Sequence, residues 1–248
     1  MMDSLGKTVE LRGSQILNYE RYHSLLWRRR LMLASTILTL LCILLFGFAV
    51  FSPNWTTINF QNTQQQHVNV ALGVWGEVRT VSNSENVPGE PQFIAYFPNP
   101  PKEILRLDDT DLRHYYRAQA AFCLISLVLM FSNNALAIYT FHHHRYMYKR
   151  LVAFMHLIVA MCVIVTSEVL TSSVNEWNIA VAIKSQTMTD WHYKSQQQYG
   201  PGTYICWTVA ASYIFAFCVF LMASSKQKGS RAATAEFEIE DRPVHIGR

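Results

Sequence analysis

Residues 31–51 read LMLASTILTLLCILLFGFAVF, an unbroken run of 21 residues without a charged side chain. An α-helix of about 20 apolar residues is long enough to cross the hydrocarbon core of a bilayer. Three further runs of similar length and composition follow at 118–141, 151–174 and 203–223. Charged residues make up only 15% of the chain, against about 25% in soluble domains. The sequence therefore predicts four membrane-spanning helices and excludes a soluble enzyme.

The first run raises the alternative of a cleaved signal peptide, because Gly47-Phe48-Ala49 resembles a small-x-small cleavage site. The apolar part of a signal peptide, however, is usually about 7–15 residues long. This run is longer, and thirty other residues precede it. We therefore expect a span that stays in the membrane.

Lysine and arginine are distributed unevenly around the four runs. Of the 21 basic residues, 14 lie in three segments and seven in the other two. The basic-rich segments are 1–30, 142–150 and 224–248, and the others are 52–117 and 175–202. Cytoplasmic segments carry the excess of basic residues, so both termini are expected in the cytoplasm, with Trp27-Arg28-Arg29-Arg30 as the strongest indication. We expect a multi-pass protein of the plasma membrane.

The formal net charge of +4 requires no nucleic-acid partner. Basic residues beside the inner leaflet attract anionic lipid, at about 1 kcal/mol each near the surface. All the cysteines lie within the apolar runs, with no CxxC pair or metal-ligand spacing, and we expect small buried side chains. Cys218, near the cytoplasmic end of the fourth run, is a candidate for palmitoylation. The cysteines are Cys42, Cys123, Cys162, Cys206 and Cys218.

The 66-residue segment 52–117 is too long to be structureless in a compact protein. Apolar residues alternate with polar or small ones over 67–74, which is the period of a half-buried β-strand. Shorter β-like stretches occupy 55–60, 77–81 and 92–97, separated by turn-forming Asn, Pro and Gly. We expect a small antiparallel sheet outside the membrane.

Four other segments carry weaker patterns. The residues DDTD at 108–111 offer N-caps for the helix of the second span, and 179–183 predicts a further strand. Apolar and aromatic residues at helical spacing over 19–26 predict an interfacial helix before the first span, with a partner-binding helix as the alternative. The polar tail 224–248 is expected to be disordered.

Three motifs follow one another along this topology. Trp55, shortly after the first span, is followed by Leu72-Gly73-Val74-Trp75. Arg117 stands at the head of the second span, and Trp207 lies in the segment 202–211 that opens the fourth. In this order they resemble the W…GLW signature, the basic residue and the span-four opening of the claudin and peripheral-myelin-protein superfamily.

The resemblance covers about residues 28–224. It implies a membrane all-α four-helix bundle with a small extracellular antiparallel β-sheet, a claudin-like fold. Two features depart from the family. Members usually carry a cysteine pair after the GLW motif, whereas 76–79 has none, so the sheet has to hold without a disulfide. The chain also ends in His245-Ile246-Gly247-Arg248 rather than in a scaffold-docking hydrophobic residue. With the long N-terminal tail, these features resemble most the invertebrate Clc-like branch.

Glu168 is the one acidic residue inside an apolar run. An intramembrane carboxylate usually has a partner, and Arg117 belongs to the same outer half, so we expect an Arg117–Glu168 pair that braces the bundle under the sheet. An ion pathway, or a solvated Glu168 near the outer headgroups, are the alternatives. His156 in span three lies at a depth comparable to that of Asn133 and Asn134 in span two, which predicts an interhelical hydrogen bond.

Two other motifs are candidate sites. His142-His143-His144 resembles a metal tract, but consecutive helical residues point in different directions and cannot all face one ion. We expect interface histidines there. Asn54-Trp55-Thr56 is an N-glycosylation sequon close to the bilayer, and occupancy of Asn54 stays open. No catalytic, cofactor-binding or metal-binding constellation appears, so we expect none, and no enzyme.

The sequence thus favours a non-enzymatic membrane protein whose outer sheet contacts other four-span proteins or further copies of itself, as claudin-like proteins do at cell junctions. The alternative is an auxiliary subunit that grips an ion channel or a receptor. A pore formed by the chain itself would need more polar residues along one helical face. Residues 82–101 and 186–199 are the expected free surfaces, and Trp55 and Trp75 are expected to pack the sheet onto the helices.

Overall fold

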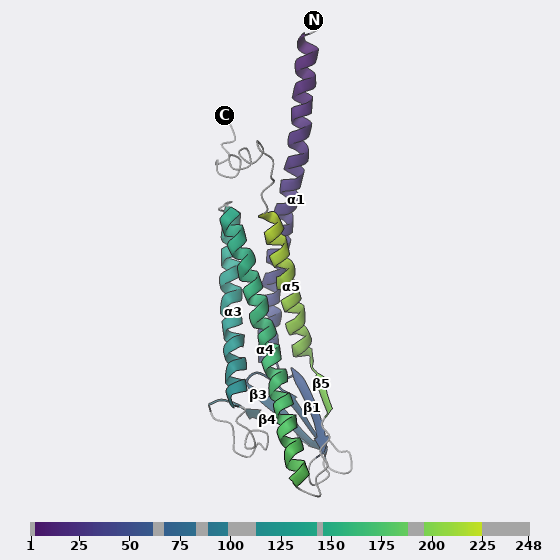
Figure 1. Cartoon of the computed structure of the whole chain (residues 1–248), viewed down its shortest axis with the longest axis vertical. Coiled ribbons are helices and arrows are strands. Elements are labelled where there is room, and N and C mark those ends of the chain that lie inside the picture. Colours follow the sequence, from purple (N-terminus) through teal and green to yellow (C-terminus); the bar gives the residue numbers. More distant parts are fainter. Residues whose placement is uncertain are drawn as a thin grey trace.

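Four helices and five strands make up the part of the chain that the computed structural model describes, residues 3–61, 67–82, 89–98, 113–142, 146–187 and 196–224. The helices are α1 (Asp3–Phe51), α3 (Arg113–His142), α4 (Tyr146–Thr187) and α5 (Pro201–Ala223). The strands are β1 (Thr56–Gln61), β2 (His67–Leu72), β3 (Gly76–Ser82), β4 (Gln92–Ala95) and β5 (Gln196–Tyr199). The helices form a long bundle with the sheet at one end (Figure 1). We call this the sheet end and the opposite end the tail end.

Each helix is long and apolar enough to cross a membrane. The candidate spans are Leu26–Phe51, His114–His142, Met147–Glu176 and Pro201–Ala223. Large apolar side chains on their outer faces are exposed, among them Leu44 (72%), Val128 (65%) and Phe131 (62%). Soluble proteins rarely leave contiguous apolar surface of this kind uncovered. The fold is that of a membrane-embedded, multi-pass protein.

The bundle is built around α4, which packs between α3 and α5, while α1 packs on α5 and over a smaller area on α3. Small and aromatic side chains fill the interior, as at Phe46, Ala160 and Tyr213. The only proline within the four spans is Pro201, in the first turn of α5, where its missing N–H breaks no helical hydrogen bond. The four spans are therefore uninterrupted helices.

The sheet is antiparallel throughout, with strand order β4-β3-β2-β1-β5. Along β2, Val68, Val70 and Leu72 are buried and alternate with the exposed His67 and Asn69. The register places Ile58 of β1 opposite Val70. One face of the sheet therefore packs into the protein, and the predicted small antiparallel sheet is confirmed.

The strand predicted at 179–183 is wrong. Helix α4 continues beyond its candidate span as far as Thr187. No glycine or proline occurs between Tyr146 and Thr187, and each residue added to an existing helix forms one more backbone hydrogen bond. The fifth strand is β5 instead, which pairs with β1.

Several sequence predictions concern residues that the structure does not describe, and one predicted helix is part of α1. The caps at 108–111, the residues His143 and His144, and the tail from 225 onward lie outside the described residues. Over 19–26 the chain is helical, as expected, but it belongs to α1, which runs from Asp3 into the first span and extends beyond the other helices at the tail end (Figure 1).

Candidate functional site at the junction of sheet and bundle

Trp55 joins the sheet to two helices. Its side chain is fully buried, and its indole Nε1–H donates to the carbonyl oxygen of Ala49 in α1 at 2.7 Å. Its backbone N–H donates to the Leu72 carbonyl at the end of β2 at 2.8 Å. Its carbonyl oxygen accepts from the Thr203 hydroxyl in α5 at 2.6 Å and from the Gly200 N–H at 2.8 Å. Trp55 is thus the node where α1, β2 and α5 meet.

The start of α5 lacks a side-chain cap, because its N-cap residue is Gly200. The first N–H groups of a helix have no helical partner. Here the Gly202 N–H donates to the Asn54 carbonyl at 3.0 Å, so the neighbouring chain supplies the missing acceptor. A Cβ on Gly202 would lie 2.8 Å from the Trp55 ring, and one on Gly200 would lie 2.4 Å from the Asn54 oxygen. Glycine is required at both positions by close packing.

The Leu72-Gly73-Val74-Trp75 motif forms the turn between β2 and β3 that presses on this node. The Gly73 N–H donates to the Gly76 carbonyl at 2.9 Å. A Cβ on Gly73 would lie 2.7 Å from the Cα of Pro53. The structure therefore brings Trp55, Leu72 and Gly73 together, although Trp55 and Leu72 are far apart in the sequence.

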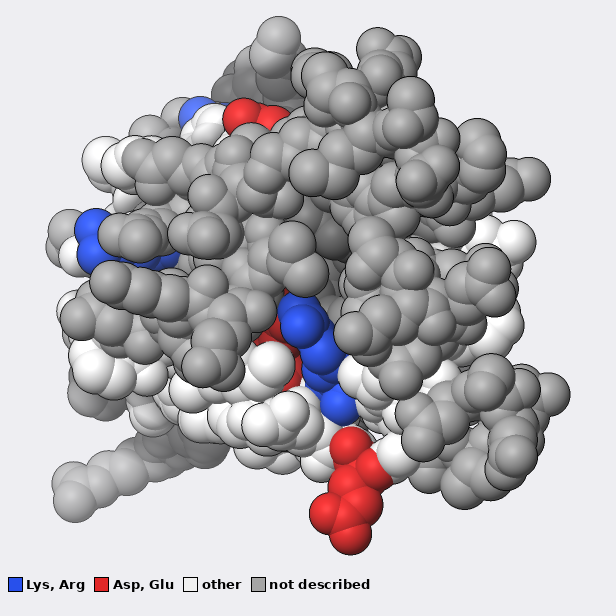
Figure 2. Space-filling view, turned by 90° about the horizontal axis from the view of Figure 1, so that it is seen from below, with Lys and Arg blue, Asp and Glu red and all other residues white. Residues whose placement is uncertain are grey.

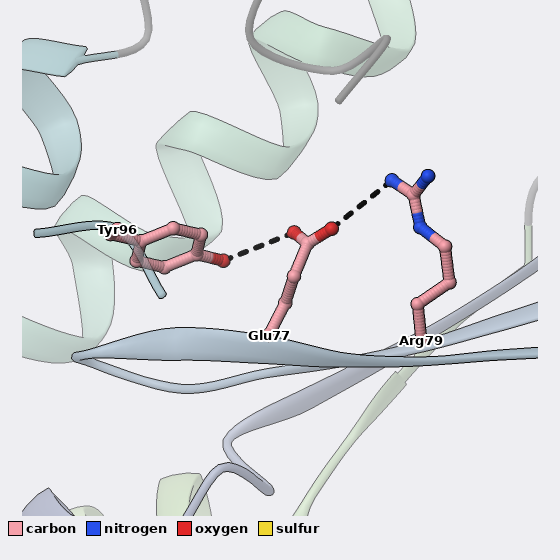
Figure 3. Close-up of polar contacts among 3 residues, drawn as sticks. All are labelled: Glu77, Arg79 and Tyr96. Atoms are coloured by element: carbon pink, nitrogen blue, oxygen red, sulfur yellow. Dashed lines mark hydrogen bonds and ion pairs between the residues drawn. The ribbon is translucent and has the colours of Figure 1, made fainter. Parts of the chain in front are cut away.

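A buried carboxylate joins β3 to the chain that follows β4 (Figure 3). Glu77 is fully buried and lies opposite Leu72 in the register, on the inward face of the sheet. One oxygen, Oε1, accepts from Nη2 of Arg79 at 3.1 Å, and Oε2 accepts from the Tyr96 hydroxyl at 3.2 Å. Arg79 keeps 20% of its side chain exposed. Burying a charge is costly unless it is paired and hydrogen-bonded, and both conditions are met here.

Tyr96 extends this contact to the bundle. Its ring stacks on Tyr116 of α3, with centroids 4.1 Å apart and planes 28° apart. The Glu77 network therefore links β3, the chain after β4 and α3 without a disulfide, and all five cysteines are free. Sequence reasoning missed these residues. The available signal was a pair of oppositely charged residues two apart in a predicted strand, Glu77 and Arg79, because residues two apart in a strand share one face.

Figure 2 shows the sheet end face-on. Near its centre, basic atoms lie against acidic atoms in a hollow, and the described residues form no continuous patch of either charge. The described part of this face is therefore a mixed surface without a strong field of one sign.

The other two tryptophans of the motifs differ in burial: Trp75 packs against the core, and Trp207 is half exposed. Trp75 is partly buried, and its ring meets Phe97 edge-on at a centroid distance of 6.0 Å. Trp207 is 48% exposed on α5, and its ring lies 5.8 Å from Tyr199 and 6.2 Å from Tyr204. Exposed tryptophan and tyrosine at the end of a span are typical of the membrane–water interface.

The predicted Arg117–Glu168 pair is not formed. Both side chains are exposed, and no ion pair joins them in the part of the chain that the structure describes. The side chains of Cys123 in α3 and Thr166 in α4 lie close to each other. Counting from that contact along antiparallel helices places Arg117 level with Ser172, about 6 Å beyond Glu168 at 1.5 Å per residue. A carboxylate that does reach α3 is Glu176, which accepts a hydrogen bond from Tyr115.

One polar layer inside the bundle receives a side chain from each helix. Thr39 of α1 donates to Oδ1 of Asn134 of α3 at 2.8 Å. Asn134 Nδ2 contacts the hydroxyl oxygen of Tyr213 of α5 at 3.4 Å. The His156 ring of α4 lies 5.6 Å from the Tyr213 ring. The predicted hydrogen bond between His156 and span two is not formed among the described residues. The Nδ1 of His156 bonds the Val152 carbonyl of its own helix at 2.7 Å, and Asn134 bonds α1 and α5 instead.

The remaining candidates have simple surroundings. Asn54 is exposed, while Thr56 of the same sequon is buried in β1. All five cysteines lie in the spans; Cys218, near the tail end of α5, is exposed, and the other four are buried or partly buried. Among the described residues, no group of three or more His, Cys, Asp or Glu side chains could hold a metal ion.

No protein-family model matches the chain, and no curated protein matches it in sequence. The fold and the junction together define a class: a multi-pass membrane protein with four apolar helices and a five-stranded antiparallel sheet held at one end of the bundle.

Proposed function

We propose that this chain is a non-enzymatic, claudin-like protein of the plasma membrane that acts through its sheet in cell–cell contact or membrane organisation. The observation that carries the proposal is the junction at Trp55. Hydrogen bonds from one residue fix the sheet to both α1 and α5, so the sheet is a rigid extension of the spans. A sheet held in this way can present a fixed surface to another protein, and the residues that hold it are those of the W…GLW resemblance.

The distribution of charge supports a sheet that faces outward from the cell. Among the residues with described side chains, Arg28, Arg29 and Arg30 lie at the start of the candidate span of α1, and Lys149 and Arg150 lie in the first turns of α4; both places are at the end of a span away from the sheet. Cytoplasmic ends of spans carry the excess of basic residues. We therefore propose that the tail end of the bundle lies on the cytoplasmic side of the membrane.

The surface proposed to meet a partner lies on β4 and the chain that follows it. Phe93 of this edge strand is 59% exposed, and Phe97 is 37% exposed. Both belong to the segment 82–101, which the sequence predicts to be a free surface. Exposed aromatic side chains outside the spans are the residue types that interfaces favour. The occupant is proposed to be another four-span protein or a second copy of the chain.

The test is affinity purification of the tagged protein, at native expression levels in a mild detergent, read by mass spectrometry and native gel. Recovery of a homo-oligomer or of related four-span proteins is expected. Phe93→Ala should reduce that recovery several-fold. Phe131→Ala is the matched control, because Phe131 is equally exposed but lies within the span of α3, and it should leave recovery unchanged.

Two outcomes would overturn the proposal. Recovery in fixed ratio with one dominant channel or receptor subunit would make the chain an auxiliary subunit. Recovery as a monomer without any partner, both in detergent and after crosslinking in intact cells, would argue against a contact function.

A further inference from the structure

Helix α3 carries a polar residue at every seventh position of its buried face: Gln119, Ser126, Asn133 and Thr140 are each 0–1% exposed. A seven-residue period keeps side chains on one helix seam. Nε2 of Gln119, Oγ of Ser126 and both amide atoms of Asn133 have no hydrogen-bonding partner among the described residues. A buried polar atom left unsatisfied costs about 1–3 kcal/mol. The unsatisfied atoms of these side chains therefore need hydrogen-bonding partners other than the side chains of the described helices.

At one level of this seam, α4 offers a second group of the same kind. His156 is fully buried, and its Nδ1 contacts the Val152 carbonyl at 2.7 Å. A carbonyl only accepts, so Nδ1 carries the proton and Nε2 is an acceptor in the neutral ring. Nε2 has no partner among the described residues. The imidazole thus presents a buried, unused acceptor.

The packing of α3 on α4 places Asn133 and His156 at the same height. Cys123 contacts Thr166 across the two antiparallel helices. Ten residues onward along α3 and ten residues back along α4 lead from this contact to Asn133 and His156. The ring centroids of Tyr139 in α3 and Tyr148 in α4 lie 5.5 Å apart. Counting from that contact places Asn133 within two residues of the height of His156, which is about 3 Å at the rise of an α-helix.

His156 and Asn134, the neighbour of Asn133, border the same side chain of α5. The ring of Tyr213 lies 5.6 Å from the His156 ring, and its hydroxyl contacts Asn134, the neighbour of Asn133. His156 therefore belongs to the polar layer that Thr39, Asn134 and Tyr213 form, and Asn133 lies at the same level.

We propose that Asn133 and His156 bind a buried water molecule between α3 and α4. The water donates one hydrogen to Nε2 of His156 and the other to Oδ1 of Asn133. Its oxygen accepts a hydrogen bond from Nδ2 of Asn133 or from another polar side chain on the same seam of α3. A buried water needs about two to four polar partners, and these atoms supply them. A metal ion does not fit, because the described residues offer a single imidazole here and no cluster of three ligands.

This water completes the polar layer. Direct hydrogen bonds already join α1, α3 and α5 through Thr39, Asn134 and Tyr213. The water adds α4, the helix at the centre of the bundle, through His156. All four spans are then linked at one level by polar contacts that pass through side chains or this water.

The test is X-ray radiolytic footprinting of the full chain in detergent, in which radicals formed from bound water oxidise adjacent side chains. Met130 is fully buried and lies one helical turn before Asn133 on the same seam. Met32 is the control, because it is 3% exposed in a separate apolar cluster with Ala137 and Val152. Met130 should be oxidised several-fold faster than Met32. Asn133→Leu should reduce the oxidation of Met130 to the level of Met32.

Equal, slow oxidation of Met130 and Met32 in the unmodified protein would overturn the proposal and would favour a direct contact between Asn133 and His156. Oxidation of Met130 that persists in Asn133→Leu would overturn it as well, because the water would then be held elsewhere. If Asn133→Leu does not fold, His156→Phe provides the second variant, and the comparison of the two methionines in the unmodified protein stands without either substitution.

Discussion

The indole nitrogen of Trp55 donates to the carbonyl oxygen of Ala49 at 2.7 Å, so the residue that leads into the first strand bonds back to the last turn of α1. The last carbonyls of a helix lack helical partners. The carbonyl oxygen of Trp55 accepts a hydrogen bond from the hydroxyl of Thr203 in the first turn of α5. One side chain and one peptide group thereby satisfy polar groups at the ends of two spans.

Replacing this side chain tests the junction. Trp55→Phe removes the indole N–H and part of a fully buried ring, so we expect a loss of about 1–3 kcal/mol, the range for a lost buried hydrogen bond. Thermal unfolding in detergent, followed by circular dichroism, measures it. Trp207→Phe is the control, since Trp207 is half exposed and surface changes usually stay within about 0.5 kcal/mol. Equal effects of the two substitutions would contradict the role given to Trp55.

The turn after β2 tests why a glycine is needed there. Gly73→Ala would place a Cβ 2.7 Å from the Cα of Pro53, which forces the backbone to move, and overpacking of this kind costs about 1–3 kcal/mol. Gly47→Ala in the span of α1 is the matched control, because no atom lies within 4 Å of its Cβ position. The unfolding midpoint should fall for Gly73→Ala and stay level or rise for Gly47→Ala. The reverse order would remove the steric argument.

The buried carboxylate gives a third prediction. Glu77→Leu deletes the acceptor of both Arg79 and Tyr96, and hydrogen bonds to charged groups contribute about 1.5–3 kcal/mol each. The sheet should therefore unfold or become protease-sensitive before the spans do. Limited proteolysis between 77 and 98, compared with Glu168→Leu, measures this. Glu168 is exposed and has no ion-pair partner in the described residues, so that control should behave as the unmodified chain, and equal protection of both variants would show that the network is dispensable.

Glycosylation reports on the side of the membrane that the sheet occupies. Asn54 follows the end of α1 by three residues, and Thr56 is buried, so we expect no sugar on the unmodified chain expressed in a eukaryotic cell. Glu85→Thr creates a sequon at Asn83, well away from the span, and should be glycosylated. A glycosidase-sensitive shift on a gel distinguishes the two. An unshifted Glu85→Thr would place the sheet in the cytoplasm, and a shifted unmodified chain would show that Asn54 is reached.

The spans and most strands could be predicted from the sequence because each depends on local composition. Twenty apolar residues define a membrane helix wherever they occur, and the alternation over 67–72 defines a strand with one buried face. The strand predicted at 179–183 was wrong because that prediction also relied on local composition. The β-branched residues there favour a strand, but the preceding helix contains no residue that stops it.

Side-chain partners were harder to predict. Arg117 and Glu168 share the outer half of the bundle, yet the height and rotation of α3 against α4 keep them apart, and those depend on how small residues pack. The burial of Glu77 could not be predicted, because glutamate in a strand is usually solvated even beside an arginine. Only the fold places Tyr96 and Arg79 against it.

The sequence by itself determined that the chain has four spans, a sheet after the first span and a strongly basic set of flanking segments, because hydropathy, period and charge are properties of consecutive residues. The tertiary structure decided that Trp55 meets Ala49, Leu72 and Thr203, that Glu77 accepts a hydrogen bond from Tyr96, and that Asn134 meets Thr39 and Tyr213. Each of these contacts joins segments that are distant along the chain, and their geometry follows from helix register and close packing rather than from local pattern.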